Sequence, residues 1–131
     1  RARHCRNRGT SLECTVGKRQ RMNEDEQLQR QIADIGTRYL KRTVGEIEQL
    51  RSYLQSLREG SHDALRSLAS MAHKIHGSGA MFGFDRVSER AYEIEQLARQ
   101  GSGEDACERL GAAVDALADE VRRQAHARGV Q

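Results

Sequence analysis

Apolar residues recur every three or four positions over most of the chain, which is the spacing of amphipathic helices. The pattern covers about residues 37–58, 62–82, 85–100 and 103–127. A glycine follows each of the first three segments, and Ser61 and Asp85 stand where N-caps would begin the second and third. Since such short joins make successive helices antiparallel neighbours, the pattern predicts an all-α fold, an antiparallel up-down-up-down four-helix bundle.

The helical pattern also extends upstream of the bundle. Leu28, Ile32 and Ile35 keep the same spacing, and Gly36 interrupts it. A glycine inside a helical pattern often marks a break. We therefore expect an additional short N-terminal helix from Asn23 to about Gly36, separate from the first helix of the bundle.

Residues 1–21 differ from the rest of the chain in charge and in pattern. They show neither helical nor strand periodicity, and they hold seven basic side chains against Glu13 alone. The remaining 15 basic and 18 acidic side chains give residues 22–131 a net charge of −3. We expect residues 1–21 to be a flexible basic arm or linker and residues 22–131 to be the bundle domain. Such an arm could contact nucleic-acid phosphates; however, no aromatic residue lies among its arginines, and nucleic acid is not the expected partner.

Composition supports the helical fold and excludes several classes of protein. The 131 residues contain no proline and no tryptophan, and the abundant Ala, Leu, Glu, Arg and Gln favour helices. The three cysteines form no CxxC pair, which argues against a zinc site or a disulfide framework. No segment approaches the roughly 20 apolar residues of a membrane span. The sequence carries no secretory signal, so we expect a cytoplasmic protein with no membrane contact.

The most unusual stretch is residues 72–83, which contain two histidines and three glycines. A glycine inside a helix costs about 1 kcal/mol relative to alanine, so something other than helix stability must explain Gly77 and Gly79. His73 falls outside the apolar stripe of its helix, and Gly77 lies one turn further on the same side. A neutral imidazole is a nucleophile, and phosphoryl transfer needs an unobstructed in-line approach. These residue types are consistent with a phosphoryl-accepting His73, with Gly77 giving access to it.

Plainer explanations exist for each of these residues. A partly exposed helical histidine is usually only a surface residue, as His62 is expected to be. His73 and His76 could be two metal ligands, but no further ligand stands at a matching spacing, so no metal site is expected. His76 could equally be a half-buried histidine bonded within the bundle. Glu95 reads as a structural or solvated carboxylate, and Gly79, on the apolar stripe, as a packing residue.

The segment from Ala72 to Gly83, with a pair on the following helix, resembles the signature of histidine-containing phosphotransfer domains, the carriers of two-component phosphorelays. The family pattern is His, any residue, Leu or Ile, Lys, Gly, then Ser or Ala, with a later Gly and a Leu-Glu-like pair. The resemblance extends over about residues 37–126. The matching positions are His73, Ile75, Gly77, Ser78, Gly83 and the pair Ile94-Glu95.

One position departs from the family pattern. His76 stands where the family usually has a lysine that helps to hold the phosphoryl group. Because His73 and His76 are one turn apart, a protonated or hydrogen-donating imidazole could take over that task. Its contribution would then depend on pH near neutrality.

The resemblance implies a phosphorelay carrier that accepts a phosphoryl group on His73 and exchanges it with the aspartate of response-regulator receiver domains. No ATP-binding or Mg²⁺-binding signature is present, so we expect a phosphocarrier and not an enzyme, without a cofactor of its own and with Mg²⁺ on the receiver. Receiver domains and a sensor histidine kinase are the expected partners of a monomer. A non-catalytic helical adaptor is the alternative. The docking surface around His73 is expected to include Lys74, Ser78, Arg66 and Arg58.

Overall fold

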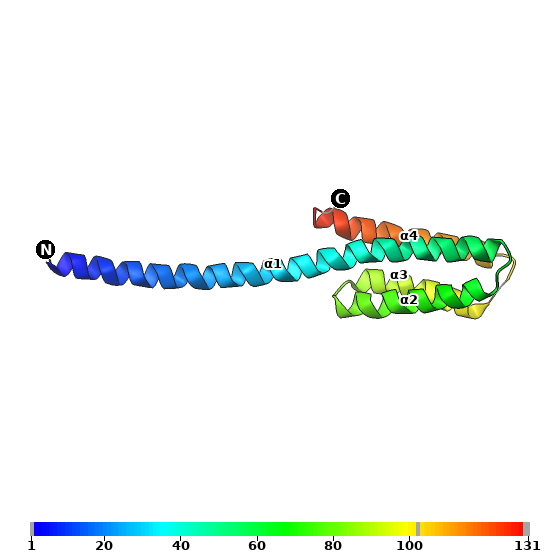
Figure 1. Ribbon diagram of the computed structural model, residues 1–131, viewed down its shortest axis with the longest axis horizontal. Helices are drawn as coiled ribbons and strands as arrows, with labels where there is room; N and C mark the ends of the chain where they lie inside the picture. The colour runs from blue at the N-terminus through cyan, green and yellow to red at the C-terminus, as the bar shows by residue number, and fades with distance from the viewer. Residues whose placement is uncertain (1, 102, 130–131) are drawn as a thin grey trace. The chain divides into compact units, whose positions relative to one another are not determined.

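The computed structural model describes residues 2–101 and 103–129, with side chains described from Asn23 onward. All of the regular structure in these residues is helical (Figure 1). The chain divides into two units, Arg1–Ile35 and Gly36–Gln131, which are described separately. The helices are α1 (Ala2–Arg58), α2 (Asp63–Met81), α3 (Asp85–Gln100) and α4 (Ala106–Ala127).

The first unit is helical throughout its described residues. Residues 2–21 therefore belong to α1, where the sequence predicted an irregular arm. Their arginines and Lys18 favour a helix and no proline interrupts one, whereas Gly9 and Gly17 are weak helix formers. The predicted boundary after residue 21 falls inside this unit. On its surface Leu28, Ile32 and Ile35 are exposed.

The helix expected over residues 23–35 is present as part of α1, but the expected break at Gly36 is absent. Gly36 is buried. A Cβ added there would lie 2.7 Å from Nη1 of Arg128, which follows α4 in the same unit. The Arg128 guanidinium therefore lies close to Gly36, and it also lies over the ring of Phe84, 4.8 Å from its centroid.

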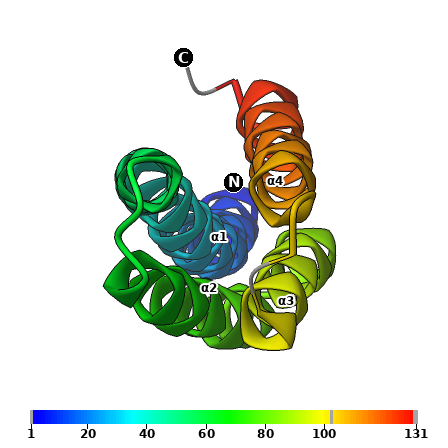
Figure 2. The same ribbon diagram turned by 90° about the vertical axis from the view of Figure 1, so that its right-hand side faces the viewer.

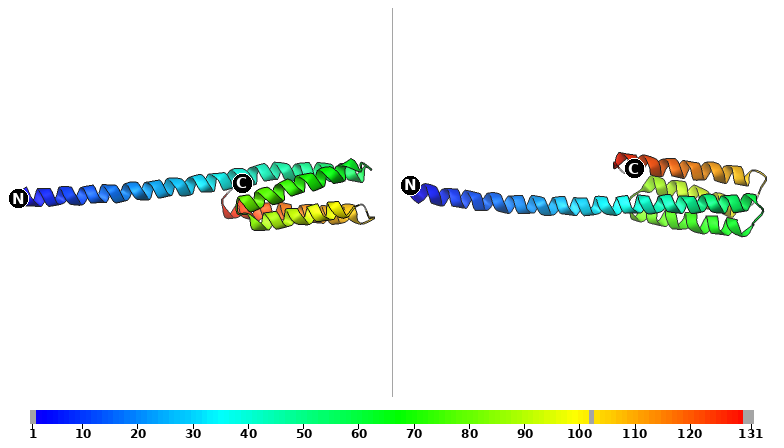
Figure 3. Two further views of the ribbon diagram at one scale, coloured as in Figure 1. Left: turned by 90° about the horizontal axis from the view of Figure 1, so that it is seen from below. Right: turned by 45° about the horizontal axis from the view of Figure 1, so that its top comes forward.

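The second unit is the four-helix bundle that the sequence predicted. Residues 36–58 of α1 and the helices α2, α3 and α4 follow one another around a common core (Figure 2). The α2 helix lies alongside this part of α1 in Figure 3 as well. Each helix contributes its apolar stripe, which confirms the predicted periodicity. The largest apolar side chains of the core that are fully buried are Leu40, Leu50, Leu68, Ile75, Val87, Ile94, Leu110, Val114, Leu117 and Val121.

Tight turns join the helices of the bundle and keep them antiparallel. Gly60 and Gly83 have φ values of +99° and +82°, a conformation that glycine adopts without strain. The Phe84 amide donates to the carbonyl of Gly79 at 2.7 Å and so closes the turn after α2. Ser61 and Asp85 are not the N-caps; these positions are held by His62 and Phe84, without a side-chain cap hydrogen bond.

Candidate functional site

His73 lies in the middle of α2 with its side chain 66% exposed. Its Nδ1 lies 2.9 Å from Oε2 of Glu95 on α3, whose side chain is only 6% exposed. The sequence predicted the exposure of His73 from its place outside the apolar stripe. A buried carboxylate from the neighbouring helix therefore holds one edge of an exposed imidazole.

The Glu95 carboxylate also determines which nitrogen of His73 carries the proton. Its Oε2 accepts from Nη2 of Arg99 at 2.7 Å, one turn further along α3. A carboxylate paired with a guanidinium is an acceptor and has no proton to donate. His73 must then donate through Nδ1, and in the neutral ring Nε2 keeps its lone pair. The arrangement presents a nucleophilic nitrogen on an exposed side chain.

His76 is half-buried and bonded to α3. Its Nδ1 lies 2.8 Å from Oγ of Ser88 and 3.1 Å from the Ser88 carbonyl oxygen. The Ser88 hydroxyl donates to the His76 carbonyl at 2.7 Å. Because the Ser88 hydroxyl proton is used in this bond, Nδ1 of His76 is the donor to the Ser88 carbonyl. Nε2 of His76 takes no part in these contacts with Ser88. The sequence left two roles open for His76, assistance to the phosphoryl group or a hydrogen-bonded place within the bundle. These contacts are those expected for the second role.

Two residues of this arrangement were not recognised as partners from the sequence. Glu95 was expected to be structural or solvated, and its contact with His73 was not foreseen, although it belongs to the Ile94-Glu95 pair. Ser88 belongs to no recognised motif. The one feature that could have drawn attention to it is a small polar side chain at a buried position of α3. Tyr92, one turn after Ser88, packs against the His76 ring with the ring centroids 5.1 Å apart.

The two glycines of α2 serve different purposes. A Cβ at Gly77 would meet nothing within 4 Å, so packing inside the described chain does not require this glycine. A Cβ at Gly79 would lie 3.0 Å from the backbone nitrogen of Ser88. Gly79 is therefore the packing residue that the sequence predicted, whereas Gly77 leaves open space on the His73 side of the helix.

Two of the four predicted docking residues face α1. Nζ of Lys74 lies 3.0 Å from Oε2 of Glu46, a buried carboxylate that makes no hydrogen bond of good geometry within the described residues. The Ser78 hydroxyl lies 3.3 Å from the phenolic oxygen of Tyr39 and 3.3 Å from the carbonyl of Ile75. Both side chains thus have partners within the bundle.

The two arginines lie in different surroundings. Arg66 shares a concavity with His73 on the α2–α3 face. Arg58 lies near α4, where its Nη2 would be 3.3 Å from a Cβ added at Gly111. The structure therefore brings Arg66, but not Arg58, to the surface beside His73.

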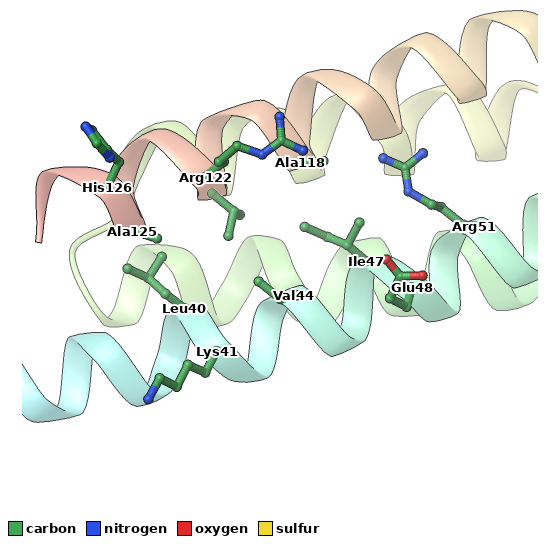
Figure 4. Close-up of a pocket in the computed structure, with 11 residues that line it drawn as sticks. Leu40, Lys41, Val44, Ile47, Glu48, Arg51, Ala118, Arg122, Ala125 and His126 are labelled. Atoms are coloured by element: carbon green, nitrogen blue, oxygen red, sulfur yellow. The ribbon is translucent and has the colours of Figure 1, made fainter. Parts of the chain in front are cut away.

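Away from His73, the described part of the chain has a second hollow but no cluster of metal-ligating side chains. A hollow between α1 and α4 is lined by apolar side chains such as Leu40, Val44 and Ile47 and by Arg122, and does not include His73 (Figure 4). Among the residues that the structure describes, no three His, Cys, Asp or Glu side chains come together to hold a metal ion. Within the same residues, every helix is too short or too polar to cross a membrane.

Comparison with known families agrees with the fold and the motif. The family model of the Hpt domain matches residues 37–124, a range that lies entirely in the second unit. The chain therefore belongs to the Hpt domain family, the histidine phosphocarriers of phosphorelay signalling. Members of this family are carriers and not catalytic enzymes, and they act with response regulators and kinases. No curated protein and no solved structure matches the chain significantly.

Proposed function

We propose that Nε2 of His73 accepts a phosphoryl group and exchanges it with the aspartate of a response-regulator receiver domain. The observation that carries this proposal is the 2.9 Å contact between Nδ1 of His73 and the buried Glu95 carboxylate. It fixes the ring in one tautomer and leaves the other nitrogen free on a side chain that is 66% exposed. A histidine that was only a surface residue would not need a buried carboxylate.

The transfer step follows from this geometry. The Nε2 lone pair attacks the phosphorus of the receiver's aspartyl phosphate; the P–N bond forms as the P–O bond to the aspartate breaks, and the aspartate leaves as a carboxylate. The imidazole ring becomes positively charged because Nδ1 keeps its proton. Glu95 lies where a negative charge stabilises that ring. The reverse step returns the phosphoryl group to an aspartate, with Mg²⁺ on the receiver and no cofactor on this chain.

His76 takes the place of the family's lysine, and its contacts limit how it can act. Ser88 occupies Nδ1, so only Nε2 is available to a phosphoryl group on His73. The ring centroids of the two histidines are 6.5 Å apart. In the neutral tautomer bonded to Ser88, Nε2 has no proton to donate. His76 therefore assists the phosphoryl group only in its protonated form.

The proposal is tested by incubating the protein with a panel of phosphorylated receiver domains. The expected result is transfer of an acid-labile, alkali-stable label to this chain, with loss of label from at least one receiver. A helical adaptor would bind a receiver without taking the label. Binding without transfer across the whole panel would therefore reject the carrier function.

Replacing Gly77 with alanine is expected to stabilise the domain and to slow transfer from receivers. A Cβ at this position meets no atom of the chain, and alanine gains about 0.5–1 kcal/mol over glycine in a helix. The same methyl group would project into the approach to His73. Urea denaturation measures the first effect and the rate of receiver-dependent labelling the second. A variant that is both more stable and fully active would show that Gly77 does not provide access.

A further inference from the structure

A concavity of about 390 Å³ adjoins His73 on the α2–α3 face of the bundle. Two alanines explain why it is hollow, since Ala69 of α2 and Ala98 of α3 fill little of the space between the helices. Its residues, which we call the His73 concavity, are Leu65, Arg66, Ala69, Ser70 and His73 of α2 with Ala98 and Arg99 of α3.

The concavity combines a small apolar surface with positive charge. Leu65 and Ala69 are partly buried and belong to the edge of the core. Arg66 and Arg99 are the charged side chains that line it, and no carboxylate does. Arg99 reaches Glu95, and Arg66 forms no ion pair with any carboxylate in the described part of the chain. An apolar hollow with a basic rim suits a partner that presents an apolar side chain beside acidic ones.

Two other features of the described surface can be compared with the His73 concavity. The hollow between α1 and α4 is larger, but its rim contains Glu48 as well as basic residues, and nothing identifies what would cover it. Leu28, Ile32 and Ile35 are exposed on the first unit, but three side chains bury too little area to define a partner. The His73 concavity differs because the reactive histidine is itself one of its lining residues.

We propose that the His73 concavity is the anchoring site for the receiver domain, which inserts one apolar side chain between α2 and α3 and places acidic side chains against Arg66. This inference rests on the proposed function, since a receiver brings an aspartate, and the carboxylates that hold its Mg²⁺, to His73. Contact with the concavity orients the aspartyl phosphate towards Nε2. The docking surface therefore extends from His73 towards the N-terminal end of α2 and does not require Lys74, Ser78 or Arg58.

The experiment compares two phosphodonors on three variants. Phosphorylated receivers need a docking surface, whereas phosphoramidate is a small donor that needs none. Arg66→Glu reverses an exposed charge of the concavity, and Ser70→Tyr fills it without changing charge. Arg122→Glu is the matched control, because it makes the same reversal beside the hollow between α1 and α4 (Figure 4).

Arg66→Glu is expected to lower the apparent second-order rate constant for transfer from receivers by about tenfold or more. Ser70→Tyr should lower it as well, while Arg122→Glu should leave it unchanged. Labelling by phosphoramidate should fall much less than labelling by receivers in Arg66→Glu and Ser70→Tyr, so the ratio of the two rates measures docking, and the remaining label shows that His73 and its fold are intact. If Arg66→Glu and Ser70→Tyr accept phosphoryl groups from receivers as fast as the wild type, docking occurs elsewhere and the inference fails. If neither donor labels the wild type, the proposed function itself fails.

Discussion

Replacing His73 with glutamine is expected to abolish the acid-labile label that the protein gains from phosphorylated receivers. Glutamine is close to histidine in length, and its amide nitrogen can still donate to the buried carboxylate of Glu95. The substitution therefore does not leave that carboxylate without one of its hydrogen-bond donors. The amide has no nucleophilic nitrogen. The loss should therefore be complete while the fold stays intact. Labelling with each receiver, beside circular dichroism of the variant, measures the two effects.

His62→Gln is the matched control for this substitution. His62 precedes the same helix and is exposed, and none of the hydrogen bonds described for this chain involves its side chain. The His62→Gln variant should gain label from phosphorylated receivers as fast as the wild type does. If His73→Gln kept a label of wild-type size, the phosphoryl group would reside on another residue, and the role assigned to His73 would be wrong.

Replacing Gly79 with valine is expected to cause the largest loss of stability in the bundle. A Cβ there would lie 3.0 Å from the backbone nitrogen of Ser88 and 3.2 Å from its Cα, so α3 itself must move. Overpacking of a well-packed core costs about 1–3 kcal/mol, and a clash with backbone belongs at the upper end of that range. The midpoint of urea denaturation should fall while the m-value stays constant.

Gly77→Val provides the control, because it adds the same side chain to the same helix two residues earlier. No atom lies within 4 Å of that Cβ, and valine ranks above glycine in helix propensity. Its free energy of unfolding should therefore equal or exceed that of the wild type. Equal midpoints for the Gly79 and Gly77 variants would contradict the assignment of Gly79 to packing against α3.

Periodicity predicted the bundle because each helix has one apolar stripe, and four such stripes can be buried together. The stripe of α2, with Leu68, Ala72 and Ile75, is buried as expected. The exposure of His73 was predicted from the same periodicity, since it depends only on where the residue lies relative to the apolar stripe of its own helix. Predictions of this kind need no knowledge of the neighbouring helix.

The contacts across helices could not be predicted in the same way. Whether Glu95 meets His73, or Ser88 meets His76, depends on the rotation and the height of α3 against α2, which the periodicity of α3 alone does not fix. The same limit applies to Lys74, which the structure pairs with Glu46 of α1. The break predicted at Gly36 was wrong because a glycine lowers helix propensity without preventing a helix, and α1 continues through this position.

The central claim is that Nε2 of His73 is the atom that carries the phosphoryl group. It is tested most directly by labelling the protein with phosphoramidate and recording long-range ¹H–¹⁵N and ³¹P nuclear magnetic resonance spectra of its histidine side chains. Because Nδ1 is held by Glu95, the account predicts one phosphohistidine, at position 73, with the phosphorus bonded to Nε2. A phosphoryl group on Nδ1 of His73, or on the ring of another histidine, would contradict it.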